Sequence, residues 1–169
     1  VGLVDNDKSA PPTVLDYPVF TNESELSNLR ERIDYALVCI GQIESPEPRI
    51  RIFELLKKFD FELPIVCSPL SYVSKHARLE EGVIVMHYAM INAGATVGKH
   101  CIINSGAIVD HDAIIGHGVH IMGAAARVAA RVHHHSMDTL YKTNSDRGHR
   151  LQSAPKSPVR EASDVWCYC

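Results

Sequence analysis

An aliphatic residue recurs at every sixth position through the middle of this 169-residue sequence, and a small side chain follows each one four positions later, from Ala77 to Ala125. A helix repeats every 3.6 residues and a strand every two, so neither element alone explains a period of six. The pattern is typical of a parallel β-helix, in which each hexad forms one flat face and three hexads complete a triangular coil. The aliphatic positions are Val73, Leu79, Val85, Ile91, Val97, Ile103, Val109, Ile115 and Ile121.

Charge and composition exclude several other classes of protein. The formal net charge of −3 gives no electrostatic reason to expect a nucleic-acid partner. No apolar run approaches 18 residues, so we expect no membrane insertion. The five cysteines are odd in number and scattered, which does not resemble a disulfide framework. Together with the lack of a recognisable signal peptide, this predicts a cytoplasmic protein.

Residues 1–66 predict an α/β domain with a parallel sheet. Apolar strands are expected at 1–5, 35–40 and 63–67, with a helix from the cap Ser45 to about Phe59. Ligands of such sheets bind beyond the carboxyl ends of the strands, although ordinary loop polarity explains the same residue types. The candidates at these ends are Asp5, Asn6, Gly41 and Gln42.

Residues 67–126 form the hexad region, and residues 127–169 are polar and aperiodic. The next two aliphatic positions in register hold Arg127 and His133, which do not suit a coil interior. We therefore expect the β-helix to stop within a few residues of Ala125 and to be followed by a disordered or irregular tail. Read one base forward, the codons for residues 145–147 permit Val-Ile-Gly, a typical hexad opening. A shifted reading frame is therefore one hypothesis for the tail.

His111 is the strongest candidate for chemistry in the sequence. It falls third in its hexad, at an outward-facing position, between Asp110 and Asp112. A carboxylate can hold one ring nitrogen and raise the basicity of the other, which is what a general base requires near neutral pH. The alternative is that solenoid surfaces are polar and that some histidines of the ten will lie beside acids by chance.

At these residues the sequence resembles the sugar acetyltransferase family that includes bacterial UDP-4-amino-sugar N-acetyltransferases and sialic acid O-acetyltransferase-like proteins, within the hexapeptide-repeat acyltransferases. The likeness runs from Val1 to about Ile121. The hexads alone indicate the superfamily, whereas the long motif ending at Asp112 is more specific. The matching motifs are Gly2-Leu-Val-Asp-Asn6, Cys39-Ile-Gly-Gln42, Ser68-Pro-Leu-Ser-Tyr-Val73, Ile91-Asn-Ala-Gly-Ala95 and Ile102-Ile-Asn-Ser-Gly-Ala-Ile-Val-Asp-His-Asp112.

The resemblance implies a nucleotide-sugar-binding α/β domain, here lacking its first strand and Gly-rich loop, and a left-handed β-helix that binds acetyl-CoA. It also implies a homotrimer with active sites between subunits, acting on a UDP-sugar or on sialic acid. Matched by position, His111 corresponds to the general base and Asp112 to the acid after it, Asn104 lies near the sugar, and His120 lies near the thioester of the cofactor. The residues matched to the nucleotide side are Asp5, Asn6 and Gly41, beside Gln42.

Two other readings stay open from the sequence. A zinc enzyme of the γ-carbonic anhydrase type also uses a left-handed β-helix and subunit-interface histidines, and His87, His111, His117 and His120 could serve as its ligands. The acids beside His111 and the attached α/β domain favour acyl transfer, for which we expect no metal. The second alternative is an inactive, truncated paralogue that retains only the fold.

Overall fold

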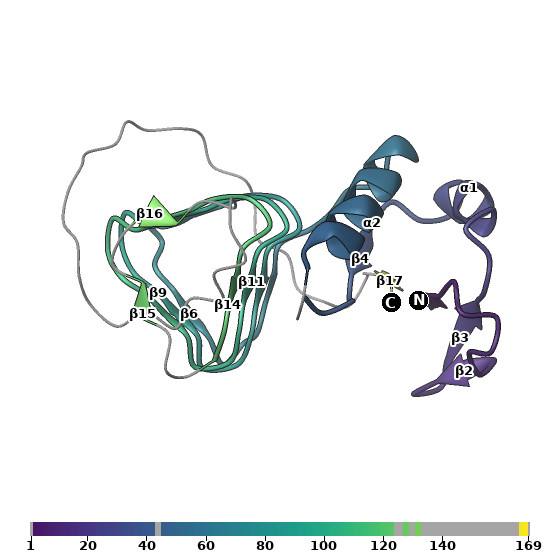
Figure 1. Ribbon diagram of the computed structural model, residues 1–169, viewed down its shortest axis with the longest axis horizontal. Coiled ribbons are helices and arrows are strands. Elements are labelled where there is room, and N and C mark those ends of the chain that lie inside the picture. Colours follow the sequence, from purple (N-terminus) through teal and green to yellow (C-terminus); the bar gives the residue numbers. More distant parts are fainter. Residues whose placement is uncertain (1, 43–44, 124–126, 129–130, 133–165, 169) are drawn as a thin grey trace. The chain divides into compact units, whose positions relative to one another are not determined.

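The computed structural model describes residues 2–42, 45–123, 127–128, 131–132 and 166–168. It divides into two compact units, which Figure 1 shows and which are described separately below. The first contains residues 1–64 together with the C-terminal strand, and the second contains residues 65–160.

The first unit is built on a five-stranded sheet with the order β2-β3-β1-β17-β4. Strand β1 runs parallel to both β3 and β17, β17 runs parallel to β4, and β2 forms an antiparallel hairpin with β3. The short helix α1 spans Glu25–Arg30. The strands are β1 (Leu3–Val4), β2 (Thr13–Val14), β3 (Tyr17–Phe20), β4 (Ala36–Val38) and β17 (Trp166–Tyr168).

Helix α2 (Glu47–Lys58) contributes side chains to the apolar core of this unit. It starts one residue later than the sequence indicates, because Pro46 occupies the cap position and the Ser45 hydroxyl accepts a hydrogen bond from the Glu47 amide. Its helical spacing places Ile52, Phe53 and Leu56 on one buried face. Their partners in the core are Val4, Leu26, Leu29, Ala36, Val38, Phe61 and Leu63.

Most of the tail predicted after residue 126, together with the hypothesis of a shifted reading frame, lies outside the described residues, but its residues 166–168 form the strand β17. β17 lies between β1 and β4, with Cys167 paired to both Leu3 and Leu37. Three residues carry too weak a local pattern to predict a strand whose pairing partners lie far away in the sequence. Cys39, directly after β4, is disulfide-bonded, which the cysteine spacing did not indicate.

The second unit is a left-handed parallel β-helix, which confirms the prediction from the hexads. Its two-residue strands form three four-stranded parallel faces, and Figure 1 shows the triangular section that they enclose. The first face contains β5 (Val66–Cys67), β8 (Ile84–Val85), β11 (Ile102–Ile103) and β14 (His120–Ile121). The second contains β6 (Tyr72–Val73), β9 (Met90–Ile91), β12 (Ile108–Val109) and β15 (Arg127–Val128). The third contains β7 (Arg78–Leu79), β10 (Thr96–Val97), β13 (Ile114–Ile115) and β16 (Arg131–Val132).

The six-residue period produces this fold because the second residue of each strand points inward. Val85, Ile91, Val97, Ile103 and Val109 are almost completely buried, and the small residues of the second track lie beside them. Each buried aliphatic side chain of this kind contributes about 1.5–3 kcal/mol through its removal from water.

The β-helix was expected to stop within a few residues of Ala125, and the described backbone continues it through β15 to β16, as far as Val132. β15 pairs with β12, and β16 pairs with β13. The register moves by one residue before β15, so Val128, and not Arg127, pairs with Val109. Between β15 and β16 the register moves back by two residues, because Val132 follows Val128 by four positions instead of six, and Val132 pairs with Ile115 in the place expected for His133. At both positions a valine pairs where the strict hexad count predicted Arg127 or His133.

The turns between the faces share one backbone feature. From Gly82 to Gly118, the second residue of every turn has a left-handed backbone with φ between 46° and 74°. Glycine tolerates this conformation best, yet it fills only alternate turns. The residues at these positions are Gly82, Tyr88, Gly94, His100, Gly106, Asp112 and Gly118.

Candidate active site

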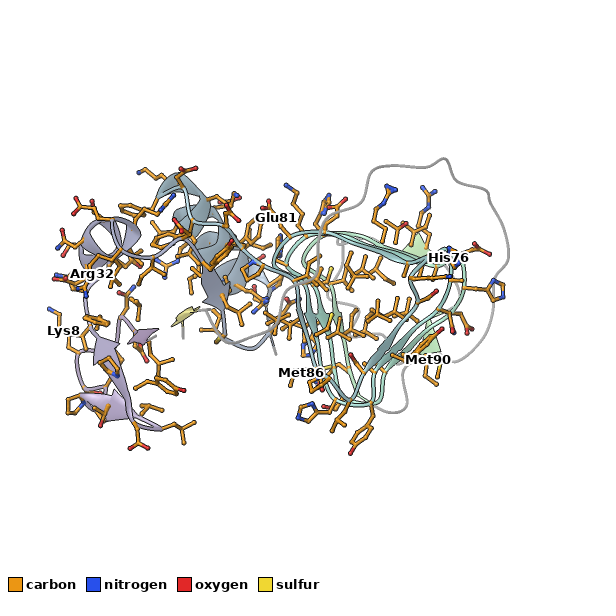
Figure 2. All side chains as sticks on the ribbon, turned by 180° about the vertical axis from the view of Figure 1, so that it is seen from behind. Lys8, Arg32, His76, Glu81, Met86 and Met90 are labelled. Atoms are coloured by element: carbon orange, nitrogen blue, oxygen red, sulfur yellow. The ribbon has the colours of Figure 1, made fainter. Side chains whose placement is uncertain are left out.

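The predicted base lies in a turn between the second and third faces. We call this stack of turns the His111 corner; it consists of residues 75–76, 93–94 and 111–112. The coils stack there through backbone hydrogen bonds from Gly94 N to His76 O (3.1 Å) and from Asp112 N to Ala93 O (3.0 Å). Figure 2 labels His76, which marks this corner in the triangular section.

His111 and Asp112 form a hydrogen-bonded pair at the outer edge of this corner. Nδ1 of His111 lies 2.9 Å from Oδ2 of Asp112, and both side chains are 79% exposed. An ionised carboxylate only accepts hydrogen bonds, so the neutral imidazole donates through Nδ1 and carries its lone pair on Nε2. Asp110, on the other side of His111 in the sequence, is buried. The pair therefore has the bonding pattern of an oriented general base.

Asn104 and His120 form a second pair, on adjacent strands of the first face. Asn104 follows β11, His120 opens β14, and Nδ2 of Asn104 lies 3.2 Å from Nε2 of His120. The amide Oδ1 accepts a 2.7 Å hydrogen bond from the Ser105 amide, so Nδ2 is the donor toward the histidine. The proton of the neutral His120 ring then lies on Nδ1, so Nδ1 of His120 is the atom of this pair that can donate a hydrogen bond to another group.

The two pairs lie at different corners of the triangle. Met86 donates its amide to the carbonyl of Ile103, which places it beside Asn104 at the end of the first face. Figure 2 shows Met86 and Met90 on either side of the corner between the first and second faces, away from His76. The second face therefore separates Asn104 and His120 from His111 and Asp112 within one chain.

The nucleotide-side candidates belong to the first unit. Asp5 and Asn6 follow β1, and Gly41 and Gln42 follow β4, so the parallel strands bring all four to one sheet edge, with β17 between. The Asp5 carboxylate accepts a 2.9 Å hydrogen bond from the Asp7 amide, and the Asn6 amide donates to Glu23. Hydrogen bonds from the Ser9 hydroxyl and amide lower the pKa of Asp7.

Arg49 is a residue at this edge that the sequence analysis did not select. It is buried in α2, and its Nη1 donates to the carbonyls of Val38 (2.7 Å) and Ile40 (3.0 Å). It thereby orders the end of β4 directly before Gly41. A single arginine within an amphipathic helix gives no sequence signal for this role, because helix arginines usually face water.

The four histidines of the zinc alternative lie apart on the β-helix. His87 bonds Ser68 at the corner between the first and second faces, whereas His117 accepts a 3.0 Å hydrogen bond from the Lys99 amide at the corner between the third and first faces. Within the part of the chain that the structure describes, no three His, Cys, Asp or Glu side chains are grouped so that they could hold a metal ion.

Comparisons with known proteins identify the family. Residues 76–111 match the family of bacterial transferase hexapeptide (six repeats) proteins. A search of curated proteins found no significant match. The solved structures include a perosamine N-acetyltransferase from Caulobacter crescentus, a histidine-to-asparagine mutant in complex with CoA and GDP-perosamine. It is 31% identical, with a TM-score of 0.64, over 78% of this chain and 67% of that one.

Two further structures extend this similarity. PerB from Caulobacter crescentus, in complex with CoA and GDP-perosamine, is 34% identical with a TM-score of 0.64, over 72% of this chain and 64% of that one. The acetyltransferase domain of PglB from Neisseria gonorrhoeae, in complex with acetyl coenzyme A, is 30% identical with a TM-score of 0.63, over 72% of this chain and 57% of that one.

The fold and these matches define a hexapeptide-repeat acyltransferase. The chain belongs to the sugar acetyltransferases of this superfamily. It spans 67%, 64% and 57% of the lengths of these three structures, respectively. In the described residues no helix combines the length and apolar character needed to cross a bilayer.

Proposed function

We propose that this protein transfers an acetyl group from acetyl-CoA to the amino group of a nucleotide-linked sugar. The observation that carries the proposal is the His111–Asp112 pair, an oriented base on the solenoid of a family whose solved members bind CoA and GDP-perosamine. The amino-sugar complexes favour transfer to nitrogen over transfer to a sialic acid hydroxyl. A cytoplasmic location stays a prediction.

In this proposal His111 acts as the general base. Asp112 holds Nδ1 and keeps the lone pair on Nε2, which accepts the proton that the acceptor amine loses as it attacks the acyl carbon. Acetyl-CoA supplies the activated acyl group, and its thiolate leaves with that proton. General-base catalysis of this kind contributes about 10²–10⁴-fold to the rate.

Asn104 and His120 suit the other half of the reaction. The amide of Asn104 directs the His120 proton to Nδ1, so the ring can donate to an oxygen that gains negative charge. A thioester carbonyl becomes such an oxygen when the amine attacks it. We assign this donor to the acetyl-CoA side and Asn104 to the sugar side of the site.

The separation of the two pairs supports a site shared between subunits of a homotrimer. His111 is largely exposed in one chain, whereas a general base works best in a site from which water is excluded. Exposed apolar side chains surround the corner between the first and second faces, as an association surface would require. They are Leu70, Tyr72, Met86, Tyr88 and Met90.

The nucleotide is proposed to bind at the carboxyl edge of the sheet in the first unit, as is usual for parallel sheets. Asp5, Asn6, Gly41 and Gln42 lie at this edge. A Cβ placed on Gly41 would meet no atom within 4 Å, so there is open space beside its backbone. Arg49 orders the segment before Gly41 through its hydrogen bonds to the carbonyls of Val38 and Ile40, and it adds a positive charge near the edge where a diphosphate would bind.

A direct test uses isotope-labelled acetyl-CoA with two matched nucleotide sugars that differ only in an amino or a hydroxyl group at the acceptor carbon. Free sialic acid serves as a third acceptor. The proposal predicts label on the amino sugar and at least about 100-fold less on the hydroxyl sugar, because an amine is the stronger nucleophile. Label on sialic acid alone would contradict the choice of acceptor. The absence of label from all three, with acetyl-CoA bound, would indicate the inactive paralogue.

A further inference from the structure

We propose that Gly94 is a positioning residue that sets the geometry of the His111–Asp112 pair from the preceding coil. The inference rests on the proposed acetyl transfer for its kinetic consequence, but the geometry stands independently of the reaction. Gly94 occupies the turn directly beneath Asp112 in the His111 corner, since Asp112 N bonds Ala93 O at 3.0 Å.

The carboxylate of Asp112 fills the space that Gly94 leaves empty. A Cβ added to Gly94 would lie 2.2 Å from Oδ1 of Asp112 and 3.3 Å from its Cγ. The other oxygen of the same carboxylate, Oδ2, is the one that bonds Nδ1 of His111. One oxygen is therefore packed against the glycine while the second holds the base, so a side chain at position 94 would displace both.

Backbone conformation alone does not explain the glycine. Gly94 has φ +74°, but Tyr88, His100 and Asp112 occupy the equivalent positions of other turns with φ of 59°, 46° and 59°. The β-helix thus accommodates side chains at this type of position. The clash at Gly94 involves the end of a flexible side chain, which can rotate away. We therefore expect a substitution to leave the fold in place and to break the Asp112–His111 hydrogen bond.

The experiment compares Gly94→Ala with Asp112→Asn, with the double variant, and with Gly82→Ala as the matched control. Gly82 has a similar φ of 70° and lies beneath the non-glycine turn residue His100, at a corner without the catalytic pair. The first readout is ¹⁵N NMR of the His111 ring in the full chain, assigned with a His111→Gln variant. The second is kcat and KM for acetyl transfer.

The expected NMR result is a Nδ1–H tautomer for His111 in the wild type and in Gly82→Ala, and a shift toward Nε2–H in Gly94→Ala and Asp112→Asn. Both of these variants should lower kcat by about 10- to 100-fold, with little change in the KM for acetyl-CoA. The kcat of the double variant should lie within about twofold of the kcat of either single variant, because both changes remove the same interaction.

An unchanged His111 tautomer in Gly94→Ala would overturn the inference. So would a double variant whose losses multiply, since Gly94 would then act through general stability. If the wild type shows the Nδ1–H tautomer and Gly94→Ala loses it, while neither the wild type nor any variant transfers acetyl groups, the positioning role stands and the proposed function fails. The two conclusions are thus separated by the same set of proteins.

Discussion

At the scale of the residue, His111 is the side chain whose removal should lower turnover most. We expect His111→Ala to reduce kcat by about 10²–10⁴-fold with little effect on acetyl-CoA affinity, because the proton acceptor is lost and the binding contacts remain. Asp112→Asn should have a smaller effect, since Asp112 orients the base and takes no proton. Steady-state kinetics on the purified full chain measure both. Near-wild-type turnover in His111→Ala would remove it from the mechanism.

Cys67 gives a residue-scale prediction that is independent of catalysis. Burial raises the pKa of its thiol to about 11, because the thiolate loses its hydration. A raised pKa leaves little thiolate at pH 8, so alkylation by iodoacetamide should be about 100-fold slower than for an exposed cysteine. Peptide mapping after timed alkylation measures this rate. Modification of Cys67 as fast as of a free cysteine peptide would contradict the burial.

The sequence predicted the residues of the His111–Asp112 and Asn104–His120 pairs, but it did not predict how Asp112 packs against the preceding coil. His111 and Asp112 are neighbours in the chain, so their contact follows from local geometry. The bond between Asn104 and His120 depends on coil stacking, which the hexad register places on adjacent strands. The fit of Asp112 over Gly94 could not be predicted, because it depends on the rotamer of one side chain and on the spacing between two turns.

At the scale of the element, the two residues of one strand should differ sharply in their contribution to stability. In β13, Ile115 is buried in the solenoid core, whereas Ile114 is only partly buried on the outer surface. Ile115→Ala should lower the free energy of unfolding by about 2–5 kcal/mol through the lost burial and the remaining cavity. Ile114→Ala should lower it by less than half as much. Equal losses in urea unfolding would contradict the inward register.

The register shift before β15 gives a second element-scale prediction. Val128 takes the register position of the buried residues Ile91 and Val109, and Arg127 takes the outward one. Val128→Asp should therefore destabilise the last coil by about 2–4 kcal/mol, while Arg127→Asp should change stability by less than about 1 kcal/mol. Hydrogen exchange of the Ile108 amide, in the strand that pairs with β15, reports on this coil. The opposite order would restore the strict hexad register.

Period six predicted the β-helix because one residue type at one spacing determines both the flat face and its inward side. The same counting was wrong at Arg127, since seven residues, and not six, separate Ile121 of β14 from Val128 of β15, and no local sequence pattern marks this change of register. β17 was missed for a different reason. Its position in the sheet is set by pairing with β1 and β4, more than a hundred residues away, and no local pattern encodes such a partner.

At the scale of the whole molecule, the proposal requires two chains for every active site. His111 and Asp112 lie at one corner of the β-helix, and Asn104 and His120 lie at another. Each subunit interface of the trimer, here called a seam, would therefore combine the His111 corner of one subunit with the first face of the next. Tyr88, which is 70% exposed in the single chain, should become protected on association. We expect Tyr88→Asp to yield monomers in analytical ultracentrifugation, while the monomer retains its circular dichroism spectrum.

The measurement that tests this account most directly is acetyl transfer by mixed subunits. His111→Ala in one preparation and His120→Ala in another should each be nearly inactive alone. Unfolded together in equal amounts and refolded, they should form trimers in which about a quarter of the seams carry both an intact His111 corner and an intact first face. Labelled acetyl transfer should then return to about a quarter of the wild-type rate. A mixture as inactive as its parents, although trimeric by sedimentation, would show that the active site does not combine His111 and His120 from different chains.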